Sequence, residues 1–209
     1  VPVANAGFPG SECDLDFPLN AVPSVGTGTW TAIGPGSATY STSANDASTI
    51  ATVDAYGFYT FTWTEDNNGC TDSDDIQVVF DELPVANAGT GSDQCDLDFT
   101  FNGTSSVGIG TWTFTGPGGA TFTDVNSPTT DVTVTNYGTY EFTWTEVNGN
   151  CSSVDQVTVN FFEQPVADAG LSADQCDLDF EFAAMPSVGN GVWTQLNGTG
   201  LSTFTDDTD

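Results

Sequence analysis

Two kinds of side chain in this sequence have the chemistry to form a covalent bond or bind an ion: thiols and carboxylates. The 209 residues contain five cysteines and 29 aspartates and glutamates, but no lysine, arginine or histidine. The cysteines are Cys13, Cys70, Cys95, Cys151 and Cys176. Widely spaced thiols without histidine give no zinc or iron–sulfur ligand set. The thiols therefore indicate disulfides and an oxidising compartment.

The carboxylates recur in an Asp-Leu-Asp motif, as at Asp14 to Asp16. Alternation along a strand places both aspartates of the motif on its outward face. Calcium takes about six to eight oxygen ligands, so clustered carboxylates are candidate calcium sites, and a solvated acidic face is the alternative interpretation. The candidate ligands are Asp14, Asp16, Asp72, Asp74, Asp75, Asp96, Asp98 and Asp155. No cofactor is required, and calcium is the one candidate ion.

The absence of basic side chains excludes several classes of function. Without imidazole, amine or guanidinium groups, the chain cannot build a catalytic triad or most phosphoryl-transfer sites. A paired-carboxylate hydrolase needs two differently tuned carboxyls in a cleft, whereas the repeated acids lie on an exposed strand face, so we expect no enzyme. A net charge of -29 also argues against nucleic acid and anionic membranes as partners. With no apolar run long enough to span a bilayer, we expect no direct membrane insertion.

The elements that carry these side chains repeat along the sequence with a period of 81 to 82 residues. VPVANAGFPGSECDLDF recurs as LPVANAGTGSDQCDLDF and as QPVADAGLSADQCDLDF. The predicted domains are residues 1–82, residues 83–163 and a truncated third repeat at 164–209. The joins contain no Gly/Ser-rich or Pro-rich spacer, so we expect consecutive domains to abut.

Within each repeat the apolar residues alternate with polar ones, which is typical of half-buried strands. Tyr140, Phe142 and Trp144, for example, alternate with Glu141, Thr143 and Thr145. About seven short strands fit in each repeat, with turn signals between them, and this predicts a Greek-key sandwich. The side chains predicted for the core are Trp30, Tyr59, Phe61, Trp63, Trp112, Tyr140, Phe142 and Trp144. The fold class is therefore all-β, with sandwich domains arranged end to end.

Two disulfide registers fit the repeat. The favoured one pairs cysteines within a repeat, Cys13 with Cys70 and Cys95 with Cys151, and leaves Cys176 for a partner outside the fragment. The alternative joins Cys70 to Cys95 and Cys151 to Cys176, and it leaves Cys13 over. In a seven-strand sandwich the first cysteine and the last hairpin lie at opposite ends. Pairing within a repeat therefore requires a short or split first strand.

The favoured register also has a consequence for the acidic residues. If Cys13 bonds to Cys70, the three aspartates that follow Cys70 come close to the first Asp-Leu-Asp motif. That cluster is the strongest form of the calcium hypothesis. The second repeat has Ser152, Ser153 and Asp155 at the corresponding positions, so it does not repeat the cluster faithfully.

The segments Tyr-Gly-Phe-Tyr-Thr-Phe at 56–61 and Tyr-Gly-Thr-Tyr-Glu-Phe at 137–142 resemble the strand F signature of immunoglobulin-like domains. The resemblance implies that Tyr59 and Tyr140 are corner tyrosines and that Phe61 and Phe142 lie in the core. The opening Pro-Val-Ala-Asn-Ala-Gly and central Trp-Thr-Phe-Thr-Gly-Pro-Gly resemble PKD-type domains, although the usual acidic Gly-Asp-Gly after the tryptophan is absent.

The whole chain is similar to repetitive regions of giant cell-surface adhesins of Bacteroidota, including the SprB-type adhesins of gliding motility. The resemblance implies export by type 9 secretion and an extracellular location tethered to the outer membrane. The expected function is a stalk or display segment for surface attachment or gliding. Its expected partners are neighbouring repeats of the same chain and surface polysaccharide or other cell-surface proteins. A subunit of a self-assembling filament or sheath and a carbohydrate-binding module of a secreted enzyme are the alternatives.

Overall fold

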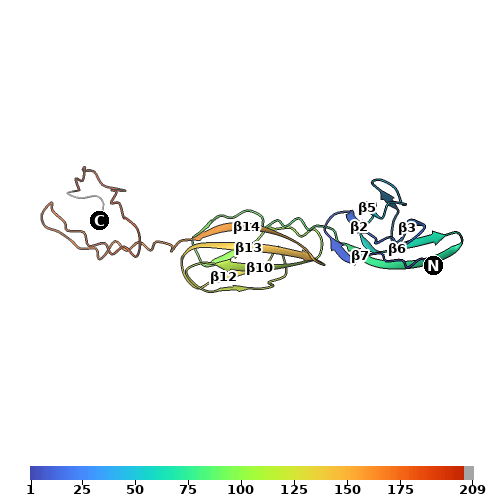
Figure 1. The fold of residues 1–209 in the computed structure, drawn as a ribbon. Helices are drawn as coiled ribbons and strands as arrows, with labels where there is room; N and C mark the ends of the chain where they lie inside the picture. Colours follow the sequence, from blue (N-terminus) through green and yellow to red (C-terminus); the bar gives the residue numbers. More distant parts are fainter. Residues whose placement is uncertain (205–209) are drawn as a thin grey trace.

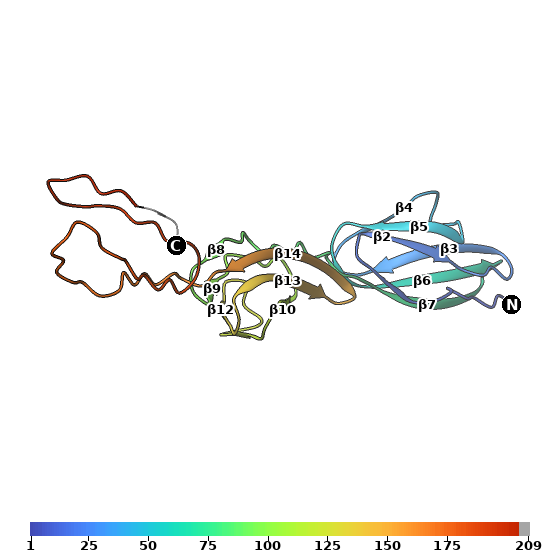
Figure 2. The same cartoon turned by 90° about the vertical axis from the view of Figure 1, so that its left-hand side faces the viewer.

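Residues 1–204 are described by the computed structural model, which contains two β-sandwiches in tandem (Figures 1 and 2). The alternating sequence forms seven strands in each sandwich, and in both the apolar face of each sheet turns inward. The strands of the first sandwich are β1 (Gly10–Glu12), β2 (Asp16–Asn20), β3 (Thr27–Ile33), β4 (Ala38–Tyr40), β5 (Ser48–Val53), β6 (Gly57–Asn67) and β7 (Cys70–Phe80). One sheet has the order β1-β7-β6-β3 and the other β2-β5-β4.

The second sandwich repeats this topology strand for strand. Its elements are β8 (Asp93–Gln94), β9 (Asp98–Thr100), β10 (Ile109–Thr115), β11 (Ala120–Phe122), β12 (Asp131–Val134), β13 (Gly138–Asn148) and β14 (Cys151–Phe161). The sheets have the orders β10-β13-β14-β8 and β11-β12-β9. All adjacent strands pair antiparallel except the short first strand of each domain, which runs parallel to the last. This order is that of an immunoglobulin-like Greek key.

The core of each sandwich is built on paired tryptophans. Trp30 lies opposite Trp63 in the register of β3 and β6, and their ring centroids are 5.2 Å apart. Trp112 and Trp144 repeat the pair at 5.0 Å. All eight aromatic side chains that the sequence assigned to the core are at most 2% exposed.

The corner tyrosines also take the positions that the resemblance implied. The hydroxyl of Tyr59 donates a hydrogen bond to the carbonyl oxygen of Ala55 at 3.1 Å, and it accepts one from the backbone N–H of Gly36 at 2.9 Å. Tyr140 donates to the carbonyl oxygen of Asn136 at 3.2 Å. Each tyrosine therefore fixes the turn that enters the long strand of its sheet.

The third repeat differs from the two sandwiches. Residues 162–204 contain no helix or strand, and the last five residues of the predicted domain lie outside the described residues. Phe182 still packs near Trp193, with ring centroids 4.4 Å apart. The sequence contains no third counterpart of β13 and β14, so this segment lacks the strands on which the other two cores are built. Residues 1–204 contain no helix with the length and hydrophobicity that a transmembrane span needs.

Candidate functional site

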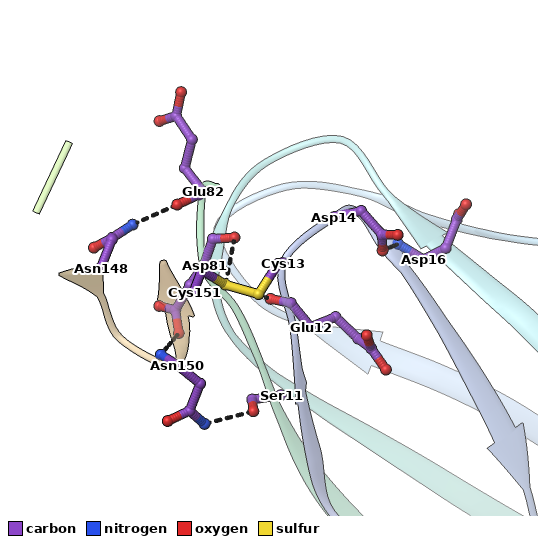
Figure 3. The surroundings of a disulfide bond; sticks show 10 residues. All are labelled: Ser11, Glu12, Cys13, Asp14, Asp16, Asp81, Glu82, Asn148, Asn150 and Cys151. Carbon is purple, nitrogen blue, oxygen red and sulfur yellow. Dashed lines mark hydrogen bonds between the residues drawn. A yellow bond between two sulfur atoms is a disulfide. The ribbon is translucent and has the colours of Figure 1, made fainter. Parts of the chain in front are cut away.

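The junction between the two sandwiches is the site where the reactive side chains meet. A disulfide joins Cys13 of the first domain to Cys151 of the second, with 5.5 Å between their Cα atoms (Figure 3). Cys13 follows β1, and Cys151 is the first residue of β14, directly after the tip of the β13–β14 hairpin. The bond therefore crosses between domains and closes a sequence separation of 138 residues.

Both disulfide registers predicted from the sequence are therefore wrong. Cys13 is not bonded to Cys70, Cys151 is bonded neither to Cys95 nor to Cys176, and those three other cysteines are free and exposed. The cause is the direction of the first strand. β1 runs parallel to the end of β7, with Gly10 opposite Val78 and Glu12 opposite Phe80.

This pairing leaves Cys13 at the end of the domain where the chain leaves it. Cys70 begins β7 at the other end, about 33 Å away along an extended strand. A thiol that far away cannot form the bond, since bonded cysteines have Cα atoms less than about 7 Å apart. The hairpin of the next domain starts from the same end and reaches Cys13 instead (Figure 3).

Hydrogen bonds near the disulfide join the β13–β14 hairpin to β1 and to the linker that follows β7, which begins with Asp81 and Glu82. The side-chain amide of Asn150 donates to the hydroxyl oxygen of Ser11 at 2.6 Å, and its backbone N–H donates to Asp81 Oδ2 at 3.3 Å. Asn148 Nδ2 donates to the carbonyl oxygen of Glu82 at 2.9 Å (Figure 3). The junction is therefore held by polar contacts as well as by a covalent bond.

Gly149 allows the hairpin tip to approach the linker this closely. Its φ is +58°, and a Cβ atom at this position would lie 1.9 Å from Asp81 Oδ2. The corresponding residue of the first domain, Asn68, has φ +54° and keeps a side chain. The turn itself therefore accepts asparagine, and the glycine at 149 gives the Asp81 carboxylate room to lie against the hairpin tip, whereas a side chain there would require that carboxylate to move.

Two buried glutamates, which the sequence analysis did not single out, fix the N-terminal end of each sandwich. Glu146 is 0% exposed and accepts hydrogen bonds from Trp144 Nε1 at 2.8 Å and from Ser106 Oγ at 2.9 Å. The same serine oxygen accepts from the backbone N–H of Val85 in the linker at 2.7 Å. The sequence signal is the repeated Trp-Thr-Glu, which places an acid two residues after a core tryptophan.

The first domain repeats this arrangement around Glu65, which is 1% exposed. Hydrogen bonds from the Ser24 hydroxyl and backbone and from Trp63 lower the pKa of Glu65 against the opposing effect of burial. Burial by itself raises the pKa of Glu146, but the hydrogen bonds from Trp144 and Ser106 outweigh it and the pKa is lowered. Both glutamates are therefore stabilised in their charged form.

The predicted calcium cluster is not formed. Asp14 and Asp16 lie near the exit of the first domain, whereas Asp72, Asp74 and Asp75 follow Cys70 at its other end, so the cluster prediction is wrong for the same reason as the disulfide. Among residues 1–204 no group of three or more Cys, Asp or Glu side chains is placed to hold a metal ion.

Several of these acids serve instead as acceptors for the backbone. Asp72 Oδ2 accepts from the N–H of Ala4 at 2.8 Å, and Asp74 Oδ2 accepts from Ala6 at 2.9 Å. In the second domain Asp155 accepts from Ala88 at 2.8 Å. Asp16 and Asp98 accept hydrogen bonds from the threonine hydroxyls of the neighbouring strand, while Asp14 and Asp96 accept backbone N–H groups two residues on. Asp75 is exposed on β7, opposite Thr62.

Comparison with known proteins shows the fold. No protein-family model and no curated protein sequence matches the chain. A three-domain immunoglobulin fragment of titin, in a variant with Glu-to-Ala mutations, matches 99% of this chain and 85% of its own, at 14% identity and a TM-score of 0.50. An I-band fragment of titin gives 13% identity with the same coverage and TM-score. At these identities the likeness establishes tandem immunoglobulin-like sandwiches and assigns no activity.

Proposed function

We propose that the chain is a stiffened extension segment of a secreted cell-surface adhesin, in which sandwiches joined end to end hold a binding region away from the cell. The observation that carries the proposal is the disulfide between Cys13 and Cys151. A bond between domains adds nothing to the internal packing of either sandwich. Its direct mechanical effect is to limit bending and twisting at the junction, and this is what a stalk requires.

The remaining junction contacts support the same proposal. A peptide linker and a disulfide tie the domains at two separate points, and hydrogen bonds from Asn148 and Asn150 hold the hairpin against the first domain. Disulfides persist in oxidising compartments, which supports a secreted or surface location. The net charge of -29 keeps neighbouring stalks apart and soluble.

Light scattering and small-angle X-ray scattering of the oxidised 209-residue chain test this proposal. Free thiols are first removed by Cys70→Ser, Cys95→Ser and Cys176→Ser, so that accidental cross-links do not contribute. We expect a monomer with two sandwiches in line, which span about 70 to 80 Å by the length of their eleven-residue strands.

The matched variant adds Cys13→Ser and Cys151→Ser to the same background, so that it too has no free thiol. We expect the same monomer with a broader distribution of interdomain distances, because only the linker and hydrogen bonds then hold the junction. Polymerisation of the oxidised chain would support the filament alternative instead. A bent or freely jointed oxidised chain would contradict the stalk proposal.

A further inference from the structure

Each end of the two-domain unit carries an unpaired cysteine that corresponds to one of the two cysteines bonded at the junction between the domains. Cys95 occupies in the second domain the position that Cys13 occupies in the first, within the repeated Cys-Asp-Leu-Asp-Phe. Cys70 follows the hairpin of the first domain as Cys151 follows that of the second. Both are free and exposed, whereas Cys151, whose bond is made, is 1% exposed.

The backbone around Cys95 is already arranged as it is around the bonded Cys13. β8 pairs parallel with the end of β14, as β1 does with β7. The residue directly after the last strand donates the same hydrogen bond in both domains. The N–H of Asp81 donates to the carbonyl oxygen of Glu12 at 2.9 Å, and the N–H of Phe162 donates to the carbonyl oxygen of Gln94 at 2.8 Å. Cys95 is therefore held beside the exit of its domain.

The hairpin that carries Cys70 is equally well formed. Cys70 lies opposite Asn67 in the hairpin register, as Cys151 lies opposite Asn148. Cys70 and Cys95 cannot bond to each other within one molecule, because they lie at opposite ends of the rod: the hairpin of β6 and β7 is at its N-terminal end and β8 at the far end of the second sandwich (Figure 2).

We propose that every junction of a longer series carries this disulfide: Cys95 bonds to the hairpin cysteine of a following sandwich, and Cys70 bonds to the first cysteine of a preceding one. The partner at each end is a further sandwich of the same repeat. Adjacent sandwiches are then joined by a continuous series of bonds, and no sandwich contains a disulfide of its own. This inference deepens the proposed function, since it makes each joint of the stalk covalent.

Bond formation requires a two-electron oxidant, which we take to be a small-molecule or protein disulfide. One cysteine thiolate attacks the donor disulfide and releases one donor thiol, and the second cysteine thiolate then displaces the other donor thiol from the mixed disulfide. The two protein thiols lose two electrons and two protons, and the donor is reduced to two thiols.

A three-domain chain tests the proposal at the Cys95 end. Residues 1–163 are followed directly by a second copy of residues 83–163, so that the natural join Glu-Leu-Pro is rebuilt and a hairpin cysteine is placed after the second sandwich. The added copy carries Cys95→Ser and Ser152→Thr, so that it has no first cysteine of its own and its hairpin peptide differs in mass from the original. The chain is refolded with oxidised glutathione, alkylated and mapped by mass spectrometry. We expect one peptide pair joining Cys95 to the hairpin cysteine of the added copy, and another joining Cys13 to Cys151.

A second version carries Phe162→Asp. Phe162 is the residue of the second domain that corresponds to Asp81 of the first, and Asp81 accepts a hydrogen bond from the N–H of Asn150 in the hairpin. If the aromatic side chain obstructs docking, this version forms the bond where the first does not. Recovery of Cys95 as a free thiol in both versions, or its pairing with a cysteine other than that of the added hairpin, overturns the inference.

Scattering by the three-domain chain, with its Cys95→Ser form as the control that lacks the second bond, separates this inference from the proposed function. If mapping finds no bond at Cys95 but scattering shows three sandwiches in line, the series of bonds is wrong and the stalk proposal stands. If the three sandwiches are freely jointed even with Cys13 bonded to Cys151, the stalk proposal also fails.

Discussion

Loss of the junction disulfide should destabilise both domains, although the bond lies inside neither. When the second domain unfolds while the first stays folded, its chain remains attached to the first domain at two points. One is the disulfide at Cys151, and the other is the peptide linker at Asp81. The unfolded segment is then a closed loop of 70 residues. The chain-entropy relation gives about 4 kcal/mol of stabilisation for a loop of this length.

That amount is a large share of the stability of a small domain, which is typically about 5–15 kcal/mol. For a domain of this size it corresponds to a fall in melting temperature of roughly 15–30 °C. The experiment compares Cys13→Ser with the oxidised parent in urea, followed by tryptophan fluorescence. Trp30 and Trp63 report on the first domain, and Trp112 and Trp144 report on the second.

Cys70→Ser is the matched control, because Cys70 is a free, exposed cysteine. We expect it to change the free energy of unfolding by less than about 0.5 kcal/mol, as surface substitutions usually do. If Cys13→Ser is as stable as Cys70→Ser while mapping shows the Cys13–Cys151 bond in the parent, the loop argument is refuted.

Three further outcomes follow from single side chains. In Glu146→Gln, the free energy of unfolding should depend less on pH below about pH 4.5. Because folding lowers the pKa of Glu146, its carboxylate stabilises the fold at pH values above its unfolded-state pKa, and this stabilisation is lost as the pH falls through its folded-state pKa. Urea titrations from pH 3 to 7 will measure the difference. Gly149→Ala should weaken the junction more than Gly69→Ala, because both glycines have positive φ but only the first approaches the linker carboxylate; hydrogen exchange at the hairpin N–H measures the difference. Tyr59→Phe should cost about 1–3 kcal/mol in thermal unfolding and Tyr140→Phe about 1, since only Tyr59 also accepts the N–H of a glycine; equal losses would contradict this.

The period of two and the 81-residue repeat were enough to predict the sandwiches, because burial alternates along a strand regardless of how strands are ordered. Trp63 and Trp144 were assigned to the core on that basis, and both are at most 1% exposed. The third repeat shows the limit of this reasoning. Its residues carry the same pattern, but without counterparts of β13 and β14 they form no strand in the described part of the chain.

The disulfide could not be predicted by counting cysteines within a repeat. Its geometry depends on the three-residue pairing of β1 with the end of β7, which places Cys13 at the exit of its domain. Such a short parallel pairing leaves little trace in the sequence. The available signal was the conflict between pairing Cys13 with Cys70 and their positions at opposite ends of a sandwich. The spacer-free join implied that the next hairpin lies nearer than the one in the same repeat.

The composition explains why the acids were misassigned. In a chain without lysine, arginine or histidine, no carboxylate can be neutralised by a basic side chain, so its strongest internal partners are N–H and O–H donors. Glu146, Asp74 and Asp155 all use such donors, and no buried side-chain nitrogen or oxygen in residues 1–204 lacks a hydrogen-bond partner.

The absence of basic side chains also affects the junction between the domains. Charged residues of opposite sign cannot hold two domains of this chain together, and both domains are strongly anionic, so their mutual repulsion opposes close contact. Screening by salt weakens that repulsion but supplies no attraction. A covalent bond is insensitive to charge and ionic strength. For an acidic chain whose domains abut, the disulfide between Cys13 and Cys151 therefore holds the junction at any ionic strength and in either protonation state of the carboxylates.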